Sequence, residues 1–324
     1  MIMQSVVLFG LGSIGVEIFR ALYHNKKYKI AGVVDNNPSK VNQDAGLIAG
    51  KKRTGLKVVS KISEIKSNPD IVIHATMSSL SDVNNQISSI VRNRINVVST
   101  CEQLVYPIGS NKKIAKTLDR LAKKYNVTIV GVGVNPGFLM DSMVLMLSSL
   151  CTKINKIKVE RIVDLTKRRK ALQKKMCLGR TPRQTRDIMN KLGHVGLEES
   201  AMMICDALNV KPKLHTKIKP IIAKHHIHSN GVSVRRGQIS GIEHNLIAKN
   251  KGSEFLRMNL SMYAGAQEYD FVEIKGIPPL SIKTSGVNGD KATVSLLLNY
   301  IPIVLSAKPG LFTLNKLRIP WAHM

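Results

Sequence analysis

A chain of 324 residues, 44% of them apolar, is long enough for about two domains with a substantial core, and its composition excludes a disordered or fibrous protein. Its 49 basic and 21 acidic residues give a net charge of +28, but the lysines are scattered along the whole chain and only 4% of the residues are aromatic. Because no helix-turn-helix or stacking module is visible, we interpret the charge as a solvated basic surface, with an anion- or RNA-binding role as the alternative.

The sequence predicts no membrane anchor, disulfide framework or metal site. The N-terminal apolar run has no basic leader, and the uncharged run at 294–307 is too short to span a bilayer. The four cysteines lie far apart without CxxC spacing, and the histidines at 225, 226 and 228 have no acid or cysteine at a metal-binding spacing. We therefore expect a cytoplasmic protein with reduced thiols, and no bound metal.

The first predicted unit is a glycine-rich turn between two strands. An apolar strand at 5–10 runs into GLGSIG, a helical pattern follows to residue 25, and the strand KIAGVVD ends at Asp35. In this dinucleotide-binding layout Gly10 permits a tight turn, Gly12 lets the backbone approach a pyrophosphate, and Gly15 lets the helix pack against the sheet. Two further residues, Ser13 and Ile14, would offer backbone N–H groups at the helix N-terminus to the phosphates.

The residues at the end of the second strand indicate which nicotinamide cofactor is bound. Asp35 lies about 20 residues after the last glycine and should accept hydrogen bonds from the ribose hydroxyls, which slightly favours NAD. The neighbouring polar residues Asn36, Asn37, Ser39 and Lys40 can instead bind or neutralise a 2′-phosphate. NADP therefore remains open as the alternative, and we include Asp35 and Asn36 among the cofactor-binding residues.

Strands and helices continue to alternate up to residue 137. Strands are predicted at 70–76, 95–100 and 127–132, with helices at 77–93 and 112–125 between them. This alternation predicts a Rossmann-type, doubly wound parallel sheet, in which ligands bind beyond the carboxyl ends of the strands. Three loops then reach the cofactor: HATMSS, STCEQL and GVNPG. They carry the predicted cofactor contacts Thr76, Met77, Thr100, Cys101, Asn135 and Pro136.

The pattern changes after Gly137. An apolar helix from about Asp141, a long strand at 153–165, the basic run 167–175 and two more helical patterns lead into a strand-rich segment at 212–282. We predict an α+β domain, residues 138–287, that carries an open, mixed, mostly antiparallel sheet for substrate binding and for dimerisation. The final helix should return to the first domain, so that residues 1–137 are completed by about 288–324, and it carries Asn299, a further predicted cofactor contact.

Several blocks together resemble the 2,4-diaminopentanoate dehydrogenase family, which is related to the dihydrodipicolinate reductases and includes the native amine dehydrogenases. The blocks are STCEQLVYP, GVGVNPGFLMD, KRRKALQKKMCLG, HVGLEES and GVNGDKATVSLLLNYIPIVLSAKPGL, in family order along the chain. The resemblance implies an NAD(P)-dependent oxidoreductase that deaminates an amine or diamino acid, such as 2,4-diaminopentanoate, to a ketone and ammonia, or runs in reverse. The family's acid in the STCE-x-L block corresponds to Glu102.

The residue chemistry agrees with a catalytic role for Glu102. A hydride leaves carbon most readily when the attached nitrogen has a lone pair, so a bound ammonium must first lose a proton to a nearby base. A carboxylate beyond the end of the strand at 95–100 can accept that proton and later direct water onto the iminium. The alternative is an ordinary solvated loop acid.

The other substrate contacts are less well defined. Asn135 can hold the substrate or merely stabilise a turn, and His194 can bind the substrate or cap a helix. Arg169, with Arg168 beside it, can grip a carboxylate or lie exposed. Two alternatives to amine oxidation stay open: a dihydrodipicolinate- or homoserine-type oxidoreductase on the same scaffold, and a non-catalytic NAD(P)-sensing protein that binds nucleic acid.

Overall fold

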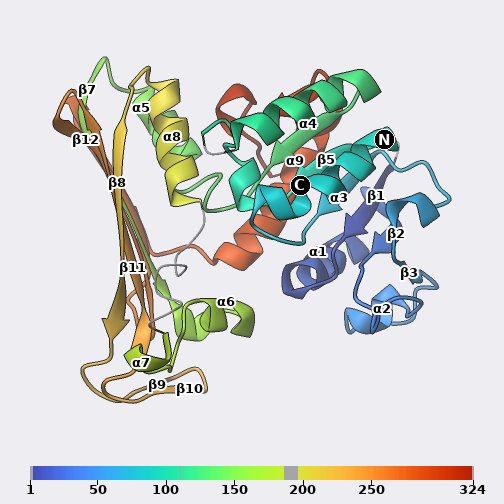
Figure 1. Ribbon diagram of the computed structural model, residues 1–324, viewed down its shortest axis with the longest axis horizontal. Helices are drawn as coiled ribbons and strands as arrows, with labels where there is room; N and C mark the ends of the chain where they lie inside the picture. The colour runs from blue at the N-terminus through green and yellow to red at the C-terminus, as the bar shows by residue number, and fades with distance from the viewer. Residues whose placement is uncertain (1–2, 110, 186–195, 323–324) are drawn as a thin grey trace. The chain divides into compact units, whose positions relative to one another are not determined.

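The computed structural model describes residues 3–109, 111–185 and 196–322, and the chain divides into two compact units. One unit contains Met1–Gly137 and Gly289–Met324, and the other contains Phe138–Asn288 (Figure 1). The second unit is therefore inserted, in chain order, between two segments of the first. Within the described ranges, no helix combines the length and the apolar run that a membrane crossing needs.

The first unit is built on a seven-stranded sheet in the order β15-β6-β5-β4-β1-β2-β3, and every pairing in it is parallel. The strands are β1 (Gln4–Phe9), β2 (Tyr28–Val34), β3 (Val58–Val59), β4 (Ile71–His74), β5 (Asn96–Ser99), β6 (Thr128–Gly131) and β15 (Gly310–Phe312). The helices are α1 (Ser13–Tyr23), α2 (Ala45–Ile48), α3 (Leu80–Arg92), α4 (Lys112–Tyr125) and α9 (Gly289–Ser306). The predicted doubly wound parallel sheet is confirmed.

Helices cover both faces of this sheet because its central strands are apolar on both sides. Every residue of β4 and β6 is buried. Helix α3 contacts α4 and β5, whereas α9 contacts α1, β4 and β5. Since a parallel crossover is right-handed, connections that run in opposite directions from β1 place their helices on opposite faces. The core between the sheet and α3 and α4 includes Leu80, Ile87, Leu118 and Ile129.

The second unit carries a six-stranded mixed sheet in the order β14-β13-β7-β12-β11-β8, with a separate hairpin of β9 and β10. Its strands are β7 (Lys153–Asp164), β8 (Lys213–Ile222), β9 (Ile227–Ser229), β10 (Val232–Val234), β11 (Ile239–Asn250), β12 (Ser253–Tyr263), β13 (Tyr269–Ile277) and β14 (Leu280–Thr284). Its helices are α5 (Ser142–Ser148), α6 (Lys170–Lys175), α7 (Pro182–Thr185) and α8 (Leu197–Ala207). All pairings in the large sheet are antiparallel except that of β7 with β12.

Side chains on the strands of the mixed sheet alternate between a packed and an open face. Along β11, His244, Leu246 and Ala248 are buried, and the intervening residues are half-exposed. Helix α8 contacts β11 and β12, and Figure 1 shows α5, α6 and α8 on one side of the sheet. This alternation is typical of an antiparallel sheet with one face on a core and one face towards solvent.

Candidate functional site

The glycine-rich turn leaves the end of β1 and enters α1. Gly10 has φ of +101°, and a Cβ there would lie 2.4 Å from the carbonyl oxygen of Ala75; a Cβ on Gly15 would lie 2.0 Å from the carbonyl oxygen of Gly10. A Cβ on Gly12, in contrast, would have no protein atom within 4 Å. The protein's own packing therefore requires glycine at two of the three positions, while the open side of Gly12 fits a closely approaching phosphate. Helix α1 starts at Ser13 without a side-chain cap, so its first N–H groups face this side.

Asp35 follows β2 directly and is buried beside this turn. Its Oδ2 accepts hydrogen bonds from the Leu11 N–H at 2.8 Å and from Lys40 Nζ at 3.0 Å, and its Oδ1 accepts one from the Asn37 N–H at 2.9 Å. Burial acts to raise the pKa of Asp35, but these three hydrogen bonds and the Lys40 charge lower it below its usual value. Asp35 therefore stays ionised, and Lys40 partly neutralises it.

The carboxyl ends of β4, β5 and β6 lie level with one another, so the three predicted loops start from one edge of the sheet. His74, Ser99 and Gly131 are aligned across these strands. The backbone continues the alignment, because the Thr100 N–H donates to the carbonyl of His74 at 2.9 Å and the Val132 N–H donates to the carbonyl of Ser99 at 2.8 Å.

Glu102 opens a short 3-10 helix, Glu102–Leu104, just beyond β5. The turn is tied to the neighbouring loop: the Gln103 N–H donates to the carbonyl of Ser78 at 3.1 Å, and Cys101 Sγ donates to the same carbonyl at 3.2 Å. Gln103 Oε1 accepts a hydrogen bond from the Leu80 N–H, at the start of α3. The Glu102 side chain is half-buried, and its Oε2 atom is shielded from solvent. The carboxylate thus sits on a fixed turn at the carboxyl end of the parallel sheet.

The same turn crosses closely over the end of β6. A Cβ on Gly131 would lie 2.4 Å from the carbonyl carbon of Leu104 and 2.5 Å from the Val105 nitrogen. Both contacts are with backbone atoms, which cannot move aside as the end of a flexible side chain can. Gly131 is therefore required for the position of the Glu102 turn.

We expect Gly131→Ala to lower the free energy of unfolding by about 1–3 kcal/mol, because the new methyl group overpacks this crossing. The matched control is Gly12→Ala, which adds the same methyl group where no protein atom lies within 4 Å. We expect that control to stay within about 0.5 kcal/mol of the unaltered chain. Urea denaturation measures both variants, and equal stabilities would contradict the assignment.

The loop after β6 carries Asn135, a buried residue with an exposed fraction of 8%. Neither its Oδ1 nor its Nδ2 has a hydrogen-bond partner in the part of the chain that the structure describes. The loop is held from α9, because Thr293 Oγ1 accepts a hydrogen bond from the Val134 N–H at 3.3 Å. Since a buried amide without partners is costly, Asn135 is suited to bind a ligand group.

A buried histidine, His74, lies directly beneath these loops. Its Nδ1 is 2.9 Å from Ser99 Oγ, and its Nε2 is 2.8 Å from Gln86 Oε1 and 3.0 Å from Thr76 Oγ1. Burial lowers the pKa of His74 from 6.5 to about 4, although its hydrogen bond with Gln86 acts in the opposite direction. The imidazole is therefore neutral near pH 7.

The neutral His74 should make stability depend on pH. The unfolded chain protonates this residue below pH 6.5 and the folded chain only below about pH 4, so its contribution is complete above pH 6.5 and is lost as the pH falls towards 4. We expect a loss of about 3 kcal/mol in the free energy of unfolding over that interval. Urea denaturation at several pH values, compared with His74→Asn, checks this expectation; identical pH profiles would contradict it.

The predicted site residues of the first unit have different exposures. Ser13, Asn36, Thr76 and Met77 are exposed, while Ile14 and Thr100 are half-exposed, and Cys101 and Pro136 are buried. Asn299 is half-exposed on α9. Sequence reasoning did not identify His74, Ser99, Gly131 or Thr293. A histidine in an otherwise apolar strand and a glycine at a strand end were the available signals.

In the second unit, the two neighbouring arginines differ from each other. Arg168 is buried, its Nη2 donates to the carbonyl of Val287 at 3.3 Å, and it lies 3.6 Å from Glu268 Oε1. The possibility that this side chain is exposed was therefore wrong, and its guanidinium is engaged within its own unit. Arg169 is half-buried at the N-cap of α6 and remains a prediction. His194 lies outside the described residues.

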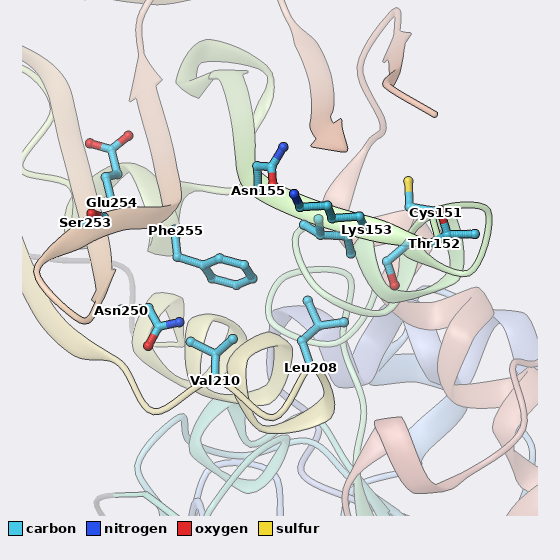
Figure 2. A pocket seen from close by; sticks show the side chains of 12 residues that line it. Cys151, Thr152, Lys153, Asn155, Leu208, Val210, Asn250, Ser253, Glu254 and Phe255 are labelled. Atoms are coloured by element: carbon cyan, nitrogen blue, oxygen red, sulfur yellow. The ribbon is translucent and has the colours of Figure 1, made fainter. Parts of the chain in front are cut away.

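The second unit also contains a pocket of about 540 Å³ at the end of its sheet where β7 and β12 begin. Figure 2 shows the ring of Phe255 extending over Leu208 and Val210 in this pocket. Its lining includes Glu254, whose carboxylate pairs with Lys156 and Arg257. The hydrogen bond from Arg257 has the largest effect on the pKa of Glu254; burial opposes it, and the further contribution of Lys156 helps to lower the pKa to about 2. None of the predicted site residues that lie in the described ranges lines this pocket.

Comparisons with known proteins match two family models to successive parts of the chain. Residues 138–324 match the family described as 2,4-diaminopentanoate dehydrogenase C-terminal domain, and residues 4–131 match dihydrodipicolinate reductase, N-terminus. The chain is 27% identical to the 2,4-diaminopentanoate dehydrogenase of Acetoanaerobium sticklandii, over 98% of this chain and 94% of the relative. It is 26% identical to an amine dehydrogenase of Streptomyces virginiae, over 50% of this chain and 46% of the relative.

Solved structures show the same fold. The amine dehydrogenase from Mycobacterium smegmatis superposes with a TM-score of 0.88 at 22% identity, covering 99% of this chain and 97% of that one. A dipicolinate-bound dihydrodipicolinate reductase from Paenisporosarcina sp. TG-14 has a TM-score of 0.53 at 12% identity, covering 97% and 99% of the two chains.

Proposed function

The chain belongs to the 2,4-diaminopentanoate dehydrogenase family, and from this membership we propose that it is an NAD(P)-dependent oxidoreductase acting on an amine. The substrate with the most support is 2,4-diaminopentanoate, which would give 2-amino-4-oxopentanoate and ammonia; the reverse reaction is the reductive amination of a ketone. The similarity to the Acetoanaerobium sticklandii enzyme along 98% of the chain supports this substrate. The observation that carries the proposal is the fixed position of Glu102 between the β4 and β6 loops, at the ligand-binding edge of the sheet.

The residues around the first turn fit a nicotinamide dinucleotide. Gly12 leaves room for the pyrophosphate, and the uncapped start of α1 supplies N–H groups and the positive end of the helix dipole. Asp35 accepts hydrogen bonds from the ribose hydroxyls. When bound, the nicotinamide accepts the hydride that leaves the substrate carbon.

Glu102 handles the proton that this chemistry requires. Its carboxylate holds the substrate ammonium and takes one proton from it, so that the nitrogen lone pair can assist the departure of the hydride. The substrate then carries a C=N bond, and the same carboxylate orients water onto that carbon and passes protons on as ammonia leaves. Because the 3-10 turn and its bonds to Ser78 fix Glu102, little reorganisation is needed between these steps.

Asn135 binds the reacting groups from the opposite loop. Its buried amide offers both a donor and an acceptor, which suits the cofactor carboxamide or a polar group of the substrate. Arg169 and His194 remain the residues proposed to bind the substrate carboxylate and amine.

A cofactor-reduction assay with diamino acids and short amines tests this function. We expect NAD(P)H to form with at least one amine, 2,4-diaminopentanoate first among them, and not with homoserine. Homoserine is the first control substrate, and tetrahydrodipicolinate, also assayed with NAD(P), is the second. Turnover of either control without turnover of any amine would overturn the proposal in favour of a reductase on the same scaffold.

The choice of cofactor should depend on Asp35 and Lys40. Asp35 repels a 2′-phosphate, whereas Lys40, 3.0 Å from its Oδ2, is placed to offset that repulsion, so we propose a preference for NAD with residual use of NADP. Asp35→Asn keeps an acceptor for the Leu11 N–H but removes the charge. We expect the ratio of kcat/KM for NAD over NADP to fall at least about tenfold in this variant, and an unchanged ratio would exclude Asp35 as the determinant.

We propose a second copy of this chain as the partner of the open face of the mixed sheet. The half-exposed row along β11 supports this assignment, since so wide a face would otherwise stay in contact with water. Analytical ultracentrifugation at micromolar concentration should give twice the mass of the chain, and the mass of a single chain would contradict the proposal.

A further inference from the structure

We propose that His74 is a positioning residue for Glu102, and that it acts through the hydroxyl of Ser99 and the backbone N–H of Cys101. The inference deepens the proposed function, because it assumes that Glu102 is the group that handles the proton. His74 itself is buried under the loops, and we assign it no contact with substrate or cofactor.

The hydrogen bonds that join His74, Ser99 and Cys101, called the relay below, run without a gap from strand β4 to the turn that carries Glu102. His74 Nδ1 lies 2.9 Å from Ser99 Oγ, and Ser99 Oγ accepts a hydrogen bond from the Cys101 N–H at 3.1 Å. Both His74 and Ser99 have an exposed fraction of 0%, so water does not compete for these bonds. Cys101 is the N-cap of the 3-10 turn that begins with Glu102, so the relay ends one residue before the carboxylate.

The partners of His74 fix which nitrogen carries the proton. Gln86 Oε1 carries no hydrogen and can only accept hydrogen bonds. It accepts one from the hydroxyl of Thr76 at 2.8 Å, and its contact with His74 Nε2, also at 2.8 Å, requires Nε2 to be the donor. In the neutral ring Nδ1 must then accept, and the Ser99 hydroxyl donates to it. This directs a lone pair of Ser99 Oγ to the Cys101 N–H.

A different arrangement would break the relay. If Nδ1 carried a proton, the Ser99 hydroxyl hydrogen would have to turn away from the ring into a site where both residues are fully buried. The low pKa of His74 supports the neutral ring as the working form near pH 7. The ring therefore holds Ser99 in one orientation, and Ser99 holds the backbone from which Glu102 projects.

Two substitutions of His74 distinguish the contact of Nδ1 with Ser99 from the contacts of Nε2 with Gln86 and Thr76. The amide of His74→Asn can occupy the place of Nδ1 and accept from Ser99, whereas the longer His74→Gln reaches the place of Nε2 and meets Gln86 and Thr76. We expect His74→Gln and Ser99→Ala to lower kcat for amine oxidation at least about tenfold with KM for NAD(P) within about twofold of the unaltered chain. We expect His74→Asn to keep kcat within about threefold.

His244→Gln in the second unit is the control for replacing a buried histidine by glutamine. His244 is also buried, and its Nε2 lies 2.8 Å from Thr216 Oγ1. We expect this variant to retain kcat. A role of His74 in stability alone predicts that His74→Asn and His74→Gln lose kcat equally or not at all, and either result would overturn the proposal. Combination with Glu102→Gln gives a second test, because His74→Gln should cause no further loss in that background; an additive loss also overturns the relay.

Hydrogen–deuterium exchange separates failure of this inference from failure of the proposed function. If the unaltered chain oxidises no amine, the proposed function fails, but the relay still predicts faster exchange of the Cys101 amide in His74→Gln and Ser99→Ala than in His74→Asn. Equal exchange in all three variants would overturn the relay itself. Far-UV circular dichroism identifies any variant that does not fold, and Ser99→Ala, the smallest change, then carries the comparison.

Discussion

Glu102→Gln should lower kcat for amine oxidation at least about 100-fold and leave NAD(P) binding unchanged, because glutamine preserves the shape of the side chain but cannot accept a proton. The substitution changes neither the glycine-rich turn nor Asp35, and it leaves the neighbouring contacts Thr100 and Cys101 in place, so the dissociation constant of NAD(P) should not move. Single-turnover kinetics and cofactor titration by fluorescence measure the two quantities separately.

The matched control is Glu64→Gln. Glu64 also lies in a 3-10 turn of the first unit, Ile62–Glu64, and it is exposed. We expect this variant to keep full kcat. If Glu102→Gln retained turnover comparable to that of the control, the proton-handling role would have to be assigned to another group.

The second large effect concerns stability. Arg161 and Asp270, on the neighbouring strands β7 and β13, form an ion pair in which each side chain is almost fully buried. Burial lowers the pKa of Arg161, and the charge of Asp270 opposes this effect. Asp270→Ala would leave the guanidinium charge buried without that partner, so we expect a loss of about 3–5 kcal/mol in the free energy of unfolding of the second unit.

A more exposed pair provides the comparison. Glu254 pairs with Lys156 and Arg257, whose side chains are 38% and 44% exposed, and Glu254→Gln should cost less than about 1 kcal/mol. Urea denaturation of both variants gives the two losses. Comparable losses would show that burial of the Arg161–Asp270 pair is not what makes it important.

Much of the first unit could be predicted because its signals are local. The glycine spacing, the apolar strands and the helix at 112–125 are each defined by neighbouring residues, and α4 spans Lys112–Tyr125 as predicted. The position of Glu102 followed from the rule that loops at the carboxyl ends of parallel strands lie together. Gly131 also carried a signal, since glycine in a strand often marks a close approach of backbone.

The features that were missed depend on partners far along the chain. Strand β15 has three residues, and its pairing with β6 across about 180 residues leaves no local pattern. Alternation of apolar residues also does not reveal that β7 pairs in parallel with β12. His74 meets Gln86 and Ser99, which lie 12 and 25 residues away, so its role required the fold. Arg168 is buried by contacts with Val287 and Glu268 that no spacing indicates.

The division of the first unit into two stretches of sequence sets an order of events during synthesis. Helix α9 contacts β5, and strand β15 pairs with β6. Both leave the ribosome only after all of residues 138–288. The nascent first unit must therefore wait, with β6 as an open edge strand, while the inserted unit is made and folds. Assembly of the cofactor-binding sheet is completed only when translation passes Phe312.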